Sequence, residues 1–67
     1  MSVLKVIELM ASSDKGWEDA TRNAVKIAGK TLKGIRSVYI QDQSAVVKDN
    51  EVVEFRVNLK VTFEINK

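Results

Sequence analysis

The chain has 67 residues and a formal net charge of only +2, and it contains no cysteine, histidine or proline. These absences exclude disulfides, thiol chemistry and the side chain that most often binds metals or acts as a general base near neutral pH. The small net charge does not predict a nucleic-acid partner. We expect residues 1–67 to form a single domain.

A chain of this length has difficulty stabilising itself. Ordering costs about 1.5 kcal/mol per residue, on the order of 100 kcal/mol here, and burial in so small a core roughly cancels this cost. Without disulfides or a structural metal, self-association is the expected support. The N-terminus has no apolar run of the length of a signal peptide or a membrane span, so we expect a cytoplasmic protein with no membrane partner.

Residues 3–10 are predicted to form the first strand. Their apolar side chains are interrupted only by Lys5 and Glu8, so both faces are apolar. A strand that is apolar on both faces is usually covered on both faces, which implies a partner subunit. Residues 11–13 are expected to end this strand, with Ser13 as the N-cap of a helix.

Residues 14–33 are predicted to form an amphipathic helix about 30 Å long. Its apolar side is rich in alanine, which allows close approach to a sheet. The side chains on that face are Trp17, Ala20, Ala24, Ile27, Ala28 and Thr31. Gly34 is expected to close the helix in a left-handed cap.

Residues 36–47 and 53–65 are predicted to form a β-hairpin around an Asp49-Asn50 turn, because both residues tolerate left-handed backbone angles. Residues 53–65 alternate apolar and polar side chains without exception, as a strand with one buried face does. The expected register pairs Lys48 with Glu51, Val46 with Val53, Gln43 with Arg56, Ile40 with Leu59, Tyr39 with Lys60 and Val38 with Val61.

That register places Asp42 and Ser44 on the face meant for burial. Two explanations are open. Either a β-bulge intervenes near these residues, or this end of the hairpin extends past the helix. The lengths favour an extension, because the last strand would run roughly 40 Å.

The predicted fold is therefore α+β with a β-α-β-β order. A right-handed crossover leaves a gap between the first and second strands, which the third strand can fill. We expect a three-stranded antiparallel sheet wrapped on one helix, with residues 53–65 in the middle.

Two features of the helix are candidate sites. A basic stripe runs along its polar face, but Glu18 and Asp19 interrupt it and Glu18 suits an i,i+4 pair with Arg22, so a solvated surface is favoured. Trp17 lies on the apolar face, where packing is favoured over ligand stacking. The basic residues of the stripe are Lys15, Arg22, Lys26, Lys30 and Lys33.

The polar face of the hairpin is either solvated or the wall of a ligand site. Its side chains are Ser37, Tyr39, Gln41, Gln43, Arg56, Asn58, Lys60 and Glu64. Scattered carboxylates at Glu8, Asp42, Glu54 and Glu64 allow a calcium or magnesium site gathered around a symmetry axis. No catalytic set, phosphate loop or metal-ligand spacing is present, so the sequence does not predict an enzyme.

Three stretches resemble the dodecin family. They are Lys5-Val6-Ile7-Glu8-Leu9, then Ser12-Ser13 with Trp17-Glu18-Asp19-Ala20, and Val57-Asn58-Leu59-Lys60-Val61-Thr62-Phe63. The resemblance covers almost the whole chain. It implies a hollow homododecameric shell that binds flavins (riboflavin, FMN or FAD) in pairs and stores them, with Ser37, Tyr39, Gln43 and Arg56 at the ligand site.

Two positions differ from the flavin-binding members of that family. Ser37 stands where they have the tryptophan that stacks on the flavin, and Arg56 stands where they have a glutamine that bonds the flavin edge. Tyr39 and Arg56 offer a weaker platform. The chain thus resembles a tryptophan-less branch similar to calcium dodecins, and the alternative function is a structural or interaction assembly that binds no flavin and holds divalent cations such as calcium.

Overall fold

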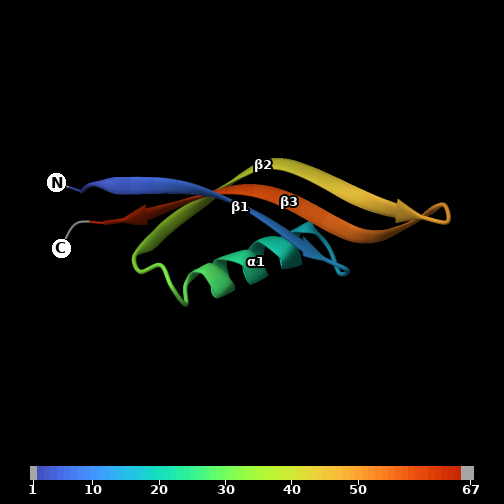
Figure 1. The fold of residues 1–67 in the computed structure, drawn as a ribbon, viewed down its shortest axis with the longest axis horizontal. Coiled ribbons are helices and arrows are strands. Elements are labelled where there is room, and N and C mark those ends of the chain that lie inside the picture. Colours follow the sequence, from blue (N-terminus) through green and yellow to red (C-terminus); the bar gives the residue numbers. More distant parts are fainter. Residues whose placement is uncertain (1, 66–67) are drawn as a thin grey trace.

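The computed structural model describes residues 2–65. The elements are β1 (Leu4–Ser13), α1 (Trp17–Ala28), β2 (Ile35–Lys48) and β3 (Glu51–Glu64). The strands form one antiparallel sheet in the order β1-β3-β2, and α1 lies against one face of it (Figure 1). The predicted α+β fold and the central place of the last strand are confirmed. No helix in this part of the chain is long and apolar enough to cross a membrane.

The core lies between α1 and the middle of β3. The side chains of Val57, Leu59 and Val61 are 0–1% exposed, and they alternate with polar residues as the sequence predicted. Ala20 and Ala24 are the buried residues of α1. Because alanine side chains are short, the helix axis can approach the sheet closely. The expected burial of Ile27 is wrong, since its side chain is 64% exposed.

The start of α1 differs from the prediction. Residues 11–13 continue β1 by pairing with residues 57–55 of β3, so Ser13 is a strand residue and Gly16 is the N-cap. The Ser13 hydroxyl accepts a hydrogen bond from the Lys15 backbone N–H at 3.0 Å and donates one to Asp19 at 2.6 Å. Because the backbone of Ser13 pairs with Phe55 of β3, Ser13 does not cap the helix. Its side chain instead stabilises the turn that precedes the helix.

The end of α1 also comes earlier than predicted. The helix stops at Ala28, and Gly29 is its C-cap with a right-handed φ of −65°. Gly34 does have a positive φ of 76°, but it leads into β2, and its carbonyl accepts a hydrogen bond from the backbone N–H of Glu64 at 3.0 Å. Gly34 therefore supplies the reversal that brings β2 back to β3.

The helix is far shorter than the hairpin. Twelve residues of α1 span about 18 Å, whereas fourteen residues of β3 span about 46 Å. β1 stops pairing at Phe55, so residues 45–54 form a two-stranded arm that extends beyond both β1 and α1 (Figure 1). The predicted extension past the helix is confirmed.

These proportions give an elongated molecule with an unusually large surface. Its extents are 51 × 20 × 13 Å and its radius of gyration is 13.7 Å, against about 11 Å for a compact chain of this length. The accessible surface is 5204 Å², against roughly 4,200 Å² for a compact monomer of 7.5 kDa. About 1,000 Å² of surface is therefore exposed beyond what a folded monomer usually shows.

The arm ends in the predicted two-residue turn. Asp49 and Asn50 have φ values of 54° and 65°, and Lys48 pairs with Glu51. Two consecutive left-handed residues form the type I′ turn that matches the twist of a hairpin.

Substitution of Asn50 tests this turn. Asn50→Val should lower the free energy of unfolding by about 1–2 kcal/mol, because a β-branched side chain clashes with the backbone at positive φ. Asn50→Gly should hold or raise stability, since glycine adopts this φ without strain. Urea unfolding followed by circular dichroism measures both, and equal stability of the two variants would contradict the turn assignment.

Candidate functional site

The sheet face opposite α1, here called the open face, carries the polar side chains of β3. Lys60 alternates with the buried residues Leu59 and Val61, so it points to the open face. It pairs with Glu8 on β1 and with Tyr39 on β2, as predicted for Tyr39. Paired residues share a face. One row across the three strands therefore holds a carboxylate, an ammonium group and a phenol.

A β-bulge at Gln41 changes the register of β2. Ile40 pairs with Leu59 as predicted, but Asp42 then pairs with Asn58, which leaves Gln41 as the extra residue. Asp42 and Ser44 thereby move to the open face. The bulge thus resolves the conflict in the sequence register, because Asp42 and Ser44 still lie in the three-stranded part of the sheet, before the arm begins.

Two predicted pairings are wrong because of such shifts. Gln43 pairs with the buried residue Val57, so it lies on the helix side of the sheet and does not face Arg56. A second irregularity pairs Val46 with Glu54 in place of Val53. Of the four predicted ligand residues, Ser37, Tyr39 and Arg56 therefore lie on the open face, whereas Gln43 lies on the face toward α1.

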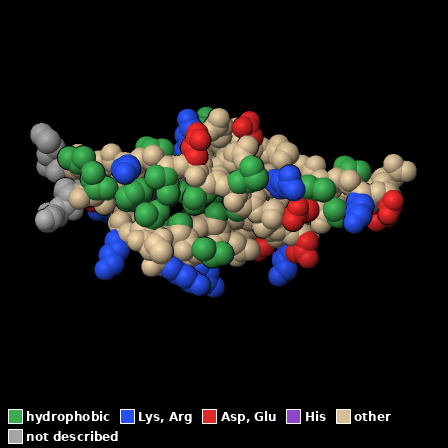
Figure 2. Space-filling view, viewed as in Figure 1, with side chains coloured by type: hydrophobic (Ala, Val, Ile, Leu, Met, Phe, Trp, Pro, Cys, Tyr) green, Lys and Arg blue, Asp and Glu red, His purple; other side chains and the backbone are tan. Residues whose placement is uncertain are grey.

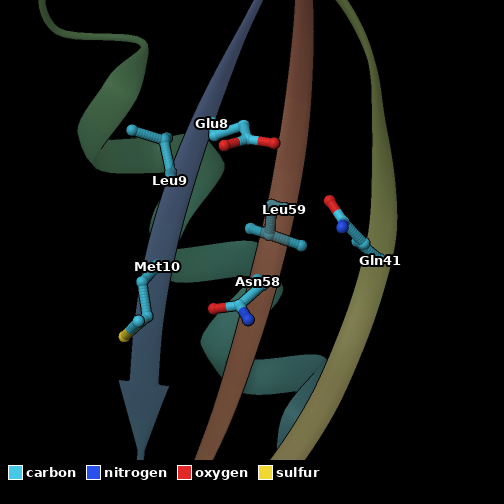
Figure 3. A pocket seen from close by; sticks show the side chains of 6 residues that line it. All are labelled: Glu8, Leu9, Met10, Gln41, Asn58 and Leu59. Atoms are coloured by element: carbon cyan, nitrogen blue, oxygen red, sulfur yellow. The ribbon is translucent and has the colours of Figure 1, made fainter.

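A shallow cavity of about 350 Å³ lies beside the bulge on the open face. Figure 3 shows Gln41 on β2 and Glu8 on β1 reaching toward β3, with Asn58 projecting from β3 lower in the view. The cavity is lined by Glu8, Leu9, Met10, Gln41, Asn58 and Leu59. One carboxylate and two carboxamides can accept and donate hydrogen bonds to a small polar ligand. The sequence predicted Gln41 and Asn58 for the polar face of the hairpin and Glu8 as one of several scattered carboxylates. The position of Asp42 on the face expected to be buried was the signal for a bulge, and the bulge brings these three residues to one cavity.

Tyr39 is the exposed aromatic side chain of the open face. It lies on the edge strand β2 with 65% of its surface accessible. Two residues before it, Ser37 pairs with Thr62 and is also exposed. A tyrosine ring exposed in this way can stack on a planar ligand.

Arg56 lies at the other end of the open face. It is placed between Ser12 of β1 and Ser44 of β2, and its Nε atom is 3.5 Å from a carboxylate oxygen of Glu54. Thr62, the partner of Ser37, lies six positions further along β3, which corresponds to about 20 Å. One chain therefore does not bring Ser37 and Arg56 to a common ligand.

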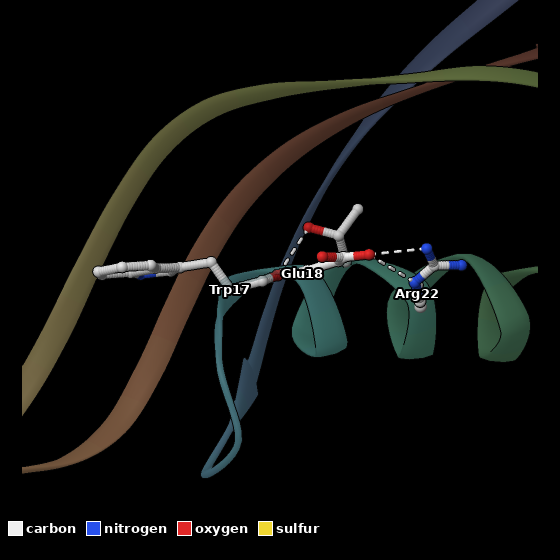
Figure 4. A network of polar contacts seen from close by, with 4 residues as sticks. Trp17, Glu18 and Arg22 are labelled. Atoms are coloured by element: carbon white, nitrogen blue, oxygen red, sulfur yellow. Dashed lines mark hydrogen bonds and ion pairs between the residues drawn. The ribbon is translucent and has the colours of Figure 1, made fainter.

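Trp17 packs between α1 and the base of the arm. Its indole N–H donates a hydrogen bond to the backbone carbonyl of Ser44 at 2.9 Å. Its ring meets Phe55 edge to face, with centroids 4.9 Å apart and an interplanar angle of 76°. Figure 4 shows the ring extending from the start of α1 toward the hairpin. The predicted packing role is confirmed.

The outward face of α1 is a solvated surface at Arg22. Its guanidinium donates two hydrogen bonds to one carboxylate oxygen of Glu18, at 2.7 and 3.2 Å (Figure 4). That hydrogen bonding and the charge of Glu18 raise the pKa of Arg22 above its ordinary value. The predicted i,i+4 pair is thus present, and it neutralises part of the basic stripe.

The carboxylates proposed for a metal site are dispersed. Glu64 forms an ion pair with Arg36, and Glu54 lies near Arg56. Glu8 and Asp42 sit on different strands of the open face. Among the residues that the structure describes, no three acidic side chains gather as metal ligands do.

Comparison with known proteins gives consistent matches. The family described as Dodecin matches residues 3–66. The calcium dodecin of Mycobacterium tuberculosis is 32% identical over 65 residues, which are 97% of this chain and 92% of that protein. These matches cover the whole sheet and the helix.

Solved structures agree. A dodecin from Streptomyces coelicolor has a TM-score of 0.93 at 27% identity, covering 98% of this chain and 94% of its own. The crystal structure of the calcium-chelating antigen calcium dodecin of M. tuberculosis has a TM-score of 0.84 at 31% identity, covering 97% and 93%. The strand arrangement described above is therefore one that solved proteins adopt.

Trp17→Phe separates packing from ligand contact. Losing the hydrogen bond to Ser44 should lower the free energy of unfolding by about 1 kcal/mol. Tyr39→Phe, which removes an exposed hydroxyl, should change it by less than about 0.5 kcal/mol. Chemical denaturation compares the two variants. A larger loss at Tyr39 than at Trp17 would contradict the packing assigned to the indole.

Proposed function

This chain belongs to the dodecin family, and from that membership we propose that it forms a homododecameric shell that binds and stores a small ligand without catalysis. The observation that carries the proposal is the incomplete monomer. Its core is short, the arm is uncovered, and the surface exceeds that of a compact chain by about 1,000 Å². An interface of ordinary size buries about 800 Å² per partner, so the excess is enough for stable association.

Flavin is the proposed ligand, as riboflavin, FMN or FAD. The open face offers Tyr39 for stacking and Arg56 for hydrogen bonds to a carbonyl or phosphate. Because Ser37 and Arg56 lie about 20 Å apart along the sheet, the site is completed by a second chain. Gln43, on the helix side, would also enter such a site from a neighbouring chain.

Calcium is the second candidate, and the relative that carries this ligand in its name favours it. Glu8 and Asp42 on the open face supply carboxylate oxygens, and Gln41 and Asn58 supply amide oxygens. Calcium takes six to eight oxygen ligands, so several copies of the chain would have to contribute around a symmetry axis.

Sedimentation tests the assembly. Twelve copies of a 7.5 kDa chain give a particle of about 90 kDa. Sedimentation velocity at micromolar concentration should show one species of this mass, and adding salt should not dissociate it, because contacts of apolar side chains such as Val47, Val52 and Val53 are not screened by salt. A monomeric boundary would refute the shell.

Restoring the family's stacking residue tests the flavin site. Ser37→Trp should tighten riboflavin binding roughly 5- to 150-fold, since an aromatic stack contributes about 1–3 kcal/mol. Ser37→Ala is the matched control and should leave the affinity near that of the unchanged chain. Quenching of riboflavin fluorescence measures all three proteins.

The same titration separates the two ligands. If Ser37→Trp leaves riboflavin fluorescence unaltered while calcium chloride raises the melting temperature, the calcium function replaces the flavin one. In that case Asp42→Asn should abolish the calcium-dependent rise.

A further inference from the structure

The arm, residues 45–54, has apolar side chains that are exposed in the single chain. Val47, Val52 and Val53 are 62%, 52% and 44% exposed. β1 and α1 both end before this segment, so only two strands support each other there. An isolated two-stranded hairpin is at best marginally stable in water. The arm is therefore built to rest on another surface.

A second uncovered apolar surface lies between β1 and the C-terminal half of α1. This groove has a volume of about 530 Å³, and its apolar lining includes Ile7, Leu9, Ile27 and Leu32. Ile27 is 64% exposed. In Figure 2, hydrophobic side chains gather between the β1 and α1 edges of the molecule, while the arm lies at the opposite end.

The arm of one chain cannot reach the groove of the same chain. Trp17, at the start of α1, contacts Phe55 at the base of the arm, so the arm points away from the helix. The groove runs along the C-terminal half of α1, from Asn23 to Leu32. Figure 1 shows the two regions separated along the long axis.

We propose that the arm of each chain docks in the β1–α1 groove of a second copy, with Val47, Val52 and Val53 against the groove's apolar lining. This inference rests on the proposed self-association and assigns the surfaces that make it. The arm supplies aliphatic side chains, and the groove offers an open volume with an apolar lining. The chain exposes about 1,000 Å² more surface than a compact monomer, which exceeds the roughly 800 Å² per partner of a standard interface.

Charge favours the same pairing. The arm carries Lys48 and three acidic residues, Asp49, Glu51 and Glu54, which gives a net charge of −2 (one positive and three negative side chains). Lys26, Lys30 and Lys33 adjoin the groove residues Ile27, Thr31 and Leu32 in the sequence, and all three lysines are exposed. Opposite charges at the rim of an interface fix its register and speed association.

An arm-to-groove contact joins two different patches. Such heterologous contacts repeat from copy to copy until a ring or shell closes. The geometry therefore favours an assembly of three or more chains over a simple dimer.

Cysteine cross-linking tests the contact, because the unchanged chain has no cysteine. Val53→Cys and Ile27→Cys are made in separate chains that differ in mass, then mixed, dissociated, reassembled and oxidised. Disulfides should form chiefly between the two variants, as seen by non-reducing electrophoresis. Arg22→Cys, exposed on the outer face of the same helix, is the matched control and should stay unlinked to Val53→Cys.

The outcomes separate this inference from the assembly itself. Disulfides between two Val53→Cys chains, or none at all in a sample that still sediments as a shell, overturn the arm-to-groove contact and leave the shell standing. A monomeric unchanged chain overturns both. If a cysteine variant fails to assemble, hydrogen exchange on the unchanged chain decides. Assembly should protect the amides of residues 45–54 and 23–32 together, and protection of one segment alone refutes the docking.

Discussion

The mismatch between a short helix and a long hairpin governs this structure. Twelve helical residues cover the middle of β3, so burial is confined to two alanines facing Val57, Leu59 and Val61. Burying a valine or leucine side chain contributes about 1.5–3 kcal/mol, and a core of this size leaves little surplus over the entropy of ordering the chain. The strands nonetheless continue for several residues past the helix. Beyond Phe55 those residues pair only with each other and have no third strand beside them.

The same mismatch shapes the candidate site. The bulge at Gln41 turns Asp42 and Ser44 to the open face, so the long strands carry a polar face on one side and a bare apolar arm at the end. Ser37, Tyr39 and Arg56 are spread along that face. In this account, ligand binding is a property of the assembled protein, because one chain holds the parts of the site too far apart.

Much of this fold follows from local patterns. The strict alternation of residues 53–65 places β3 at the centre, and Asp49-Asn50 predicts the turn because both residues tolerate positive φ. The helix ends were misjudged for a physical reason. Ile27 and Thr31 keep the 3.6-residue period, but the chain must leave the helix at Ala28 to return to the sheet at Gly34. Ser13 has the chemistry of a cap, yet pairing with β3 takes its backbone.

The ligand site was less predictable than the fold. The bulge shows in the sequence only as Asp42 and Ser44 on the wrong face, and pattern alone cannot locate the extra residue. Strict alternation of the side chains also predicts Gln43 on the polar face. The extra residue at the bulge moves Gln43 to the opposite face. Ser37 and Arg56 lie about 20 Å apart along the sheet of one chain, so no local pattern joins them in a single site.

The central claim is that folding depends on association, and the concentration dependence of unfolding tests it most directly. Thermal unfolding is followed by circular dichroism over a hundredfold range of protein concentration. For an obligate assembly the midpoint should rise with concentration, because mass action favours the folded, associated state. A midpoint that stays constant over that range would mean that the isolated chain folds on its own, and would contradict the account.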